Sequence, residues 1–275
     1  MSSARSEPVL RQAQDERGVA RGEPVEPQAQ GERVFQQPAS PYHALACDYD
    51  RTLTAGENVR GGEPLAALER LRASGRRLIL VTGRQLPDLL HIFPGVAVCD
   101  RVVAENGGLL YRPATAETQL LAPPASLRFL EALRARGAEP LFEGRTVVAT
   151  VRPHDVTAAE VIRELGLELE ITVNRESVMV LPRGVNKGTG LAVALQELHL
   201  SFEETVGIGD AENDEAFLRL CGFSAAVANA IPALKNRVGM VTTAAYGAGV
   251  AELVDRLIGD GLGTPMTGPA KPSGE

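Results

Sequence analysis

The sequence predicts an α/β fold, because strands and helices alternate along most of the chain. Short apolar runs, typical of buried strands, alternate with segments whose apolar residues recur at helical spacing. Strand–helix–strand order of this kind forms parallel, right-handed crossover units. One stretch in the middle has a different order, with a helix and two strands that occur twice. We therefore expect a parallel α/β core into which a small α+β module is inserted.

The first part of the core is expected over residues 43–112. Its four strands are His43–Cys47, Leu78–Val81, Val102–Glu105 and Leu109–Tyr111. The helix between the first two begins at Pro64 and ends at Gly75, the positions that each residue type favours. Asn106-Gly107 is a hairpin signal and joins the last two strands.

The inserted module is expected over residues 113–182. Leu127, Leu130 and Leu133 mark its first helix, and Thr157 with Glu160 forms a capping box for a second helix that Gly166 ends. Its expected strands are Leu141–Phe142, Thr146–Val151, Leu169–Val173 and Val178–Leu181. Because the module interrupts the core, we expect it to form a cap.

The core pattern resumes over residues 183–259. Helices are expected at 188–198, 214–220 and 248–258, and strands at Thr205–Gly209, Ala225–Ala228 and Val238–Val241. The core is thus discontinuous in sequence.

Two tails flank these elements. In residues 1–42 the run Glu7-Pro8-Val9 recurs as Glu23-Pro24-Val25, among Gln, Glu, Arg and Pro and few apolar residues. Such a composition buries too little surface to offset the entropy of ordering, so a disordered extension is expected, with a partner-binding tail as the alternative. Residues 260–275 have the same character.

Composition excludes several classes of protein. The 275 residues are 44% hydrophobic and carry a net charge of −7, which disfavours a general nucleic-acid binder or a protein of anionic membranes. No apolar run approaches the roughly 18 residues of a membrane span, and the first residues lack the apolar core of a secretory signal. Three scattered cysteines give neither a disulfide framework nor a metal motif. We expect a cytoplasmic protein, while the oligomeric state stays open.

The candidate chemistry begins at Asp48 and Asp50, which follow the first strand directly. Alternation along a strand places both on one side, at the carboxyl end where open α/β sheets bind ligands. Neighbouring carboxylates repel, so one binds a proton or both meet a cation. Helix capping is the alternative for such a pair.

Further signals fall at other strand and helix ends. Thr82 and Gly83 close the second strand, and Lys187, one of only three lysines, opens the helix after the insertion. Asp210 and Asp214 add two carboxylates that can hold a hard cation through oxygen. Each residue alone also has a structural interpretation: a turn hydroxyl, a solvated lysine or a helix cap.

Together these residues resemble the four motifs of the haloacid dehalogenase superfamily, and in particular its Cof-type, class IIB phosphatases. The motifs are DYDRT at 48–52, TGR at 82–84, NKG at 186–188 and GDAEND at 209–214, with the insertion between the second and third. Glu105-Asn106-Gly107 resembles the turn before the cap of that group. The short cap is similar to those of archaeal-type phosphoglycolate phosphatases and sucrose-phosphate phosphatases. Arg51 departs from the pattern, since most relatives have Gly there, and its side chain is expected to narrow access.

The resemblance implies a Rossmann-like, three-layer α/β/α core and a Mg²⁺-dependent phosphatase. It implies that Asp48 is the nucleophile, forming an aspartyl-phosphate, and that Asp50 donates a proton to the leaving group and later accepts one from water. The Mg²⁺ ligands would be Asp48, the Asp50 backbone carbonyl, Asp210 and the supporting Asp214. The phosphoryl group would be held by Thr82, the Gly83 amide and Lys187, while Asn213 orients Lys187 or the phosphate.

The cap is expected to contact the rest of a small phosphorylated metabolite, such as a sugar phosphate or a phosphoglycolate-like molecule. Its candidates are Arg145, Arg152, His154, Asn174 and Arg175, for which a solvated surface position is the alternative. A phosphotransferase or phosphomutase, and a non-catalytic phosphoryl-binding module, are the competing functions. Nucleic-acid and membrane partners are not expected.

Overall fold

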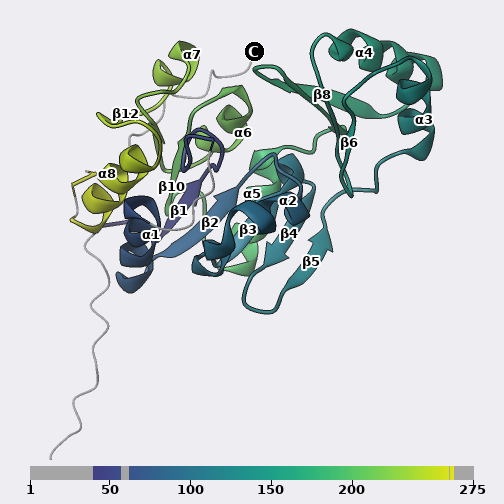
Figure 1. Ribbon diagram of the computed structural model, residues 1–275. Helices are drawn as coiled ribbons and strands as arrows, with labels where there is room; N and C mark the ends of the chain where they lie inside the picture. The colour runs from purple at the N-terminus through teal and green to yellow at the C-terminus, as the bar shows by residue number, and fades with distance from the viewer. Residues whose placement is uncertain (1–39, 57–61, 260, 263–275) are drawn as a thin grey trace, which may run out of the picture. The chain divides into compact units, whose positions relative to one another are not determined.

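A computed structural model describes residues 40–56, 62–259 and 261–262 (Figure 1). The chain divides into two compact units, Met1–Gln37 and Pro38–Glu275, and all of the described residues lie in the second. The predictions for residues 1–39 and 263–275 therefore concern residues outside the described part. No helix among the described residues combines the length and apolarity needed to cross a membrane.

The larger sheet has eight strands in the order β12-β11-β10-β1-β2-β3-β4-β5. Their bounds are β1 Ala44–Cys47, β2 Arg77–Val81, β3 Arg101–Ala104, β4 Leu109–Arg112, β5 Glu117–Leu120, β10 Thr205–Gly209, β11 Phe223–Ala226 and β12 Met240–Val241. The strands from β12 to β3 pair in parallel, whereas β4 and β5 are antiparallel to their neighbours. The α/β prediction is confirmed.

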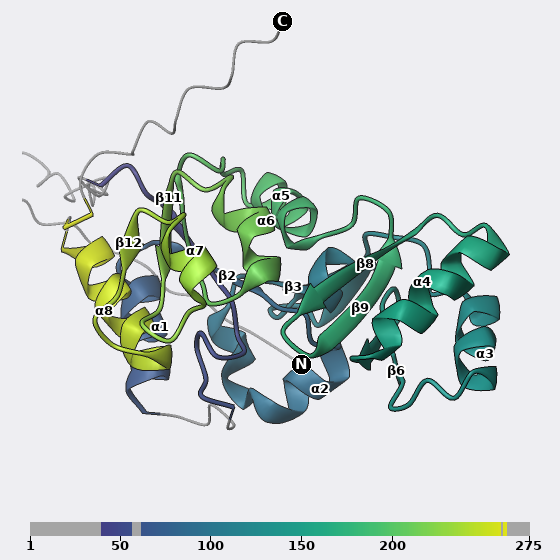
Figure 2. The same cartoon turned by 90° about the horizontal axis from the view of Figure 1, so that it is seen from above.

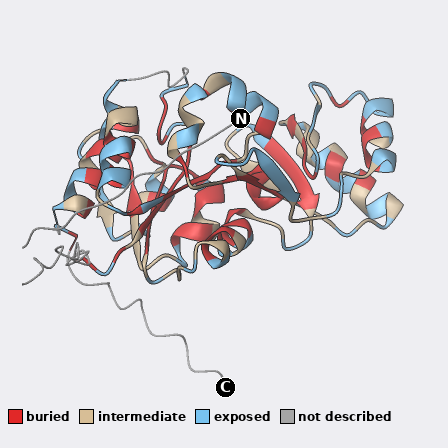
Figure 3. Ribbon diagram, turned by 90° about the horizontal axis from the view of Figure 1, so that it is seen from below, coloured by how far each residue is buried: buried red, intermediate tan, exposed pale blue. Residues whose placement is uncertain are grey.

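Helices cover both faces of this sheet. They are α1 Glu63–Ala73, α2 Leu86–Ile92, α5 Lys187–Glu197, α6 Glu215–Leu218, α7 Pro232–Lys235 and α8 Tyr246–Ile258. Helix α1 packs on α8, α5 packs on α6, and Figure 2 shows these two pairs on opposite sides of the strands. The central strands are buried on both faces, as Figure 3 shows, which explains their continuous apolar runs.

A second, antiparallel sheet has the order β6-β7-β9-β8. We call it the small sheet; its strands are β6 Phe142–Glu143, β7 Val148–Val151, β8 Leu169–Asn174 and β9 Ser177–Pro182. Val148 and Val180 face the helices α3 (Leu127–Ala135) and α4 (His154–Leu165). Met179, on the opposite face, lies against Gly83 of the larger-sheet region. The alternation of the strands thus gives the small sheet one helix-covered face and one face toward Gly83.

Several boundaries differ from those expected. Strand β5 was missed because its sequence is polar and its residues are largely exposed, so the chain leaves the larger sheet after Leu120 and not after Arg112. The capping box of Thr157 and Glu160 is wrong: helix α4 begins at His154, immediately after Pro153. Proline fits at a helix start because it has no N–H group that would be left without an intrahelical partner.

The core also includes residues that the sequence assigned to the tails. Tyr42 is fully buried, its ring lies 6.1 Å from that of Phe223, and its carbonyl accepts a hydrogen bond from Arg76. Leu262 packs on the same core. The core therefore starts before residue 43 and continues beyond residue 259.

Candidate active site

The acidic residues meet at the carboxyl edge of the larger sheet, because the strands that carry them are parallel neighbours. Asp48 follows β1 and Asp210 follows β10, and the Asp48 amide donates to the carbonyl of Ile208 at 3.1 Å. Both carboxylates are buried. The structure thus brings together two motifs that are far apart in sequence.

Lys187 lies between two of these carboxylates. Its Nζ is 2.5 Å from Oδ1 of Asp48 and 2.5 Å from Oδ1 of Asp214, and its side chain is 1% exposed. Helix α5 positions it, since the Asn186 side chain caps that helix by accepting from the amides of Gly188 and Thr189. Burial alone would lower the pKa of Lys187, but the carboxylates of Asp214 and Asp48 raise it above its ordinary value. Lys187 is therefore a fixed cation at the site.

Asp214 is held in place by the backbone. Its Oδ2 accepts from the amides of Asp210 at 2.8 Å and Ala211 at 3.0 Å. A Cβ on Gly209 would lie 2.6 Å from the Asp214 side chain, so only glycine permits this approach. The glycine of the GDAEND motif is thus a packing requirement of the site.

The three carboxylates can serve as ligands of one cation. Asp48, Asp210 and Asp214 each offer an oxygen within 4.8 Å of the others, and all three are buried. Burial, reinforced by Asp214, raises the pKa of Asp48 well above its ordinary value, although Lys187 opposes this. The three carboxylates offer only oxygen ligands, and Lys187 balances only part of their negative charge. Such a set fits a hard divalent cation such as Mg²⁺. The Asp50 carboxylate does not belong to this group.

Asp50 instead pairs with Arg84, a residue whose role the sequence did not reveal. Arg84 Nε lies 2.8 Å from Asp50 Oδ2 and its Nη2 lies 2.7 Å from Oδ1, so the two side chains pair through both oxygens. Arg84 also bonds to Asp88 and lies over the ring of Tyr49. The Asp50 side chain is 36% exposed and lines the cavity described below, so the pairing with Arg84 leaves it accessible to a ligand.

The remaining motif residues lie around the same edge. The Thr82 hydroxyl is buried and accepts from the amide of Arg84 at 3.1 Å. Asn213 donates to the side chain of Asn106 at 3.3 Å, whereas Lys187 donates to Asp48 and Asp214. Among the described residues, Asn213 makes no hydrogen bond to Lys187, so its role in orienting Lys187 or the phosphate stays a prediction. The buried Oδ1 of Asn213 has no hydrogen-bond partner among the described residues.

A cavity of about 710 Å³ connects these groups to the small sheet. From the region of the larger sheet it is lined by Asp48, Asp50, Arg51, Gly83, Arg84, Gln85, Asp88, Lys187 and Asn213. From the region of the small sheet it is lined by Phe142, Ala149, Asn174, Arg175, Glu176, Ser177 and Met179. A ligand whose phosphate reached Asp48 would therefore present its other end to the small sheet.

Two arginines in this lining converge on Asp210. Arg175, in the turn between β8 and β9, bonds to Asp210 Oδ2 at 2.8 Å, and Arg51 Nε lies 3.5 Å from the same oxygen. Arg51 has a φ of 61°, in the left-handed region that favours glycine. This conformation explains why glycine suits the position. Arg51 is among the residues that line the cavity, while the narrowing of access stays a prediction.

The structure separates the other cap candidates from this cavity. Arg145 bonds to Thr118, Arg152 lies 3.9 Å from Asp155, and His154 contacts the carbonyl of Glu139. None of the three is among the residues lining the cavity. Asn174 and Arg175 are the sequence-predicted cap residues that line it.

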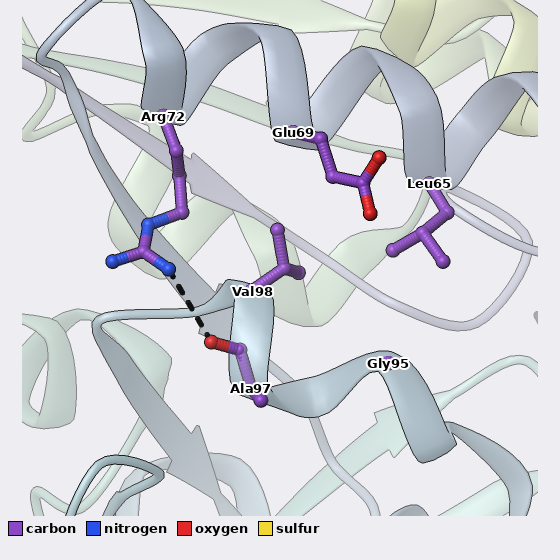
Figure 4. Close-up of a pocket in the computed structure, with 6 residues that line it drawn as sticks. All are labelled: Leu65, Glu69, Arg72, Gly95, Ala97 and Val98. Atoms are coloured by element: carbon purple, nitrogen blue, oxygen red, sulfur yellow. Dashed lines mark hydrogen bonds between the residues drawn. The ribbon is translucent and has the colours of Figure 1, made fainter.

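A different cavity of about 390 Å³ lies between α1 and the 3₁₀ turn Pro94–Val98 (Figure 4). Its lining residues are Leu65, Glu69, Arg72, Gly95, Ala97 and Val98. Arg72 there donates to the carbonyl of Ala97, and the lining includes none of the motif residues. Of these two cavities, the larger is the one that the motif residues line.

Comparison with known proteins places this geometry in a family. The model of the haloacid dehalogenase-like hydrolases matches residues 45–153 and 155–254. The phosphoglycolate phosphatase of Methanothermobacter thermautotrophicus is 32% identical over 223 residues, covering 78% of this chain and 99% of that protein.

Solved structures show the same fold. A HAD/Cof-like hydrolase from Plasmodium vivax superposes with a TM-score of 0.69 at 19% identity, covering 80% of this chain and 97% of that one. A HAD subclass IIB sugar phosphatase has a TM-score of 0.63 at 17% identity, covering 78% and 98% of the respective chains.

Proposed function

Because the chain belongs to the haloacid dehalogenase-like hydrolases and is a phosphatase of the Cof type, we propose that it hydrolyses small phosphomonoesters with the help of Mg²⁺ and an aspartyl-phosphate intermediate. The observation that carries the proposal is the contact of Asp48 with Lys187 in a cavity that Asp50 also lines. The residues proposed as the nucleophile, the fixed cation and the proton shuttle thus line the same cavity.

The proposed reaction has two steps. Asp48 attacks phosphorus, the bond from phosphorus to the ester oxygen breaks, and the leaving oxygen takes a proton from Asp50. Asp50 then accepts a proton from water as that water attacks phosphorus, which releases phosphate and restores Asp48. Lys187, Thr82 and the Gly83 amide stabilise the negative charge of the phosphoryl oxygens. For this role Arg84 must orient Asp50 toward the leaving group.

A divalent cation fits the proposal through the same carboxylates. The carboxylates of Asp48, Asp210 and Asp214 would hold it. The resemblance to the family adds the backbone carbonyl of Asp50 as a further ligand. When bound, Mg²⁺ would balance the negative charge that the phosphoryl group and the carboxylates share. Because Arg175 and Arg51 contact Asp210 here, they must share or release this carboxylate when a cation binds.

The small sheet and its helices are proposed to act as a cap that selects the leaving group. Arg51 and Arg175 bring two guanidinium groups to the cavity, an arrangement that suits a leaving group with an anion of its own. The relative from M. thermautotrophicus is a phosphoglycolate phosphatase, and phosphoglycolate carries such a carboxylate. We therefore propose phosphoglycolate-like compounds ahead of neutral sugar phosphates.

The experiment that tests this function is a screen for phosphate release. The full-length protein should release inorganic phosphate from phosphoglycolate and other phosphorylated metabolites without an added acceptor, which separates a hydrolase from a phosphotransferase. Excess EDTA should stop the release and Mg²⁺ should restore it. Full activity in EDTA, or product formation only with an acceptor, would contradict the proposal.

Asp210→Ala should reproduce the effect of EDTA in the presence of Mg²⁺. The variant loses a carboxylate of the cation site, so the rate should fall about 10²-fold or more. Asp255→Ala is the matched control. The Asp255 carboxylate is exposed, pairs with Arg70 and is not among the residues that line the cavity. Equal rates for both variants would remove Asp210 from the proposed site.

A further inference from the structure

We propose that Glu105 is a positioning residue that pins the small sheet to the phosphate-binding edge of the larger sheet and thereby sets the depth of the cavity. This inference rests on the proposed function, since the cavity is taken to hold the leaving group. Glu105 itself is not among the residues that line the cavity.

The Glu105 carboxylate is fully buried and is bound almost entirely by backbone amides of one hairpin turn. Its Oε2 accepts from the amides of Thr146 at 2.7 Å and Val147 at 3.3 Å and from the Thr146 hydroxyl at 2.9 Å. Its Oε1 accepts from the amide of Arg145 at 3.1 Å. Within the described part of the chain, no ion pair involves Glu105. A buried carboxylate needs such donors, so these contacts fix the turn that joins β6 to β7.

The two segments also approach too closely for ordinary side chains. A Cβ on Gly144 would lie 2.8 Å from Glu105 Oε2, and a Cβ on Gly108 would lie 1.9 Å from Thr146 Oγ1. Glycine on each side of the contact lets the carboxylate reach the amides. The contact is thus shaped by residues of both segments.

The backbone around Glu105 connects this contact to residues 82–84, of which Thr82 and Gly83 are proposed to bind the phosphoryl group. The Glu105 amide donates to the carbonyl of Arg84 at 2.9 Å, and the Asn106 amide donates to the carbonyl of Thr82 at 3.0 Å. Glu105 and Asn106 have φ values of 51° and 54°, an uncommon conformation for residues other than glycine. This strained turn directs the carboxylate toward the hairpin while its backbone remains bound to Thr82–Arg84.

On the other side, the pinned turn leads to the cavity. Val147 packs in one cluster with Met179, and Ala149 is the register partner of Met179 across β7 and β9. Ala149 and Met179 both line the cavity. Loss of the Glu105 contact should therefore let this wall shift, while Lys187 and Thr82 keep their own partners.

Glu105→Gln tests the proposal, because it replaces one accepting oxygen by an NH₂ donor that faces amide donors. Measured by hydrogen exchange with mass spectrometry, the amides of residues 145–147 should exchange about tenfold to a hundredfold faster. The KM for the best substrate of the screen should rise about tenfold, a loss of the size expected for one charge-assisted contact. The Ki of inorganic phosphate, which needs only the phosphoryl subsite, should stay unchanged. Glu143→Gln is the matched control, since this exposed carboxylate lies in the same hairpin and pairs with Arg134.

Thr146→Val is the second variant, because it removes only the hydroxyl contact. It should show a smaller increase in exchange and in KM, again with an unchanged Ki of phosphate. Unchanged exchange at residues 145–147 in both variants, or an equal rise of KM and phosphate Ki, would overturn the positioning role. If the wild-type protein turns over no phosphomonoester, the proposed function fails, and the exchange experiment still decides whether Glu105 pins the hairpin.

Discussion

Asp48→Asn should abolish phosphate release and yet leave the fold as stable as before or more stable. The amide cannot attack phosphorus, so kcat should fall on the order of 10⁴-fold or more, the loss typical of a deleted nucleophile. The pKa of Asp48 is raised chiefly by burial, so folding disfavours its charged form. Such a group lowers the stability of the wild type as the pH rises above the ordinary pKa of a carboxyl, and the neutral amide avoids that loss.

The stability part of this expectation is measured by thermal unfolding in EDTA. The melting temperature of Asp48→Asn relative to wild type should increase from pH 4 to pH 8. A variant that is markedly less stable than the wild type at pH 8 would contradict this stability expectation and show that the Asp48 carboxylate stabilises the fold.

Lys187→Met should lower both activity and stability, in contrast to the Asp48 variant. Lys187 is the buried cation between Asp48 and Asp214, and its removal leaves two buried carboxylates without a partner of opposite charge. Breaking a buried ion pair from one side costs about 3–5 kcal/mol in free energy of unfolding. The loss of a charge-stabilising contact should lower kcat by about 10²–10³-fold.

Urea denaturation in EDTA measures the stability change, and Lys235→Met is the matched control. Lys235 is partly buried, whereas Lys187 is fully buried. The Nζ of Lys235 donates to the carbonyl of Ala228 and has no carboxylate partner among the described residues. A Lys187 variant as stable as this control would show that the two carboxylates are protonated in the folded protein and that Lys187 does not balance them.

The sequence was most informative where chemistry and topology coincide. Asp48 and Asp210 each follow a strand of a parallel sheet, so their meeting at one edge followed from strand order alone. Lys187 is the first residue of helix α5, and the Asn186 cap fixes where that helix begins. Motif residues on short connections could therefore be located before the structure was known.

The structure was needed where long side chains choose among several partners. Arg84 stood within a motif, but its pairing with Asp50 depends on a side-chain direction that no spacing encodes. Arg145 lies in a hairpin turn and Arg152 follows a strand, as expected, yet they contact Thr118 and Asp155 and do not line the cavity. The buried contacts of Glu105 were likewise invisible, because they join two turns about 40 residues apart through backbone amides.

The most direct test of the account is the covalent state of Asp48 during turnover of p-nitrophenyl phosphate by Asp50→Asn. This variant keeps the nucleophile, and nitrophenolate leaves without a proton, so Asp48 should still be phosphorylated. Hydrolysis of the intermediate lacks its base and should slow by about 10²–10⁴-fold. We expect a stoichiometric burst of nitrophenol and, after acid quenching, phosphate on the peptide that contains Asp48. A variant with no burst and no phosphorylated peptide, as inactive as Asp48→Asn, would contradict the proposed roles of both aspartates.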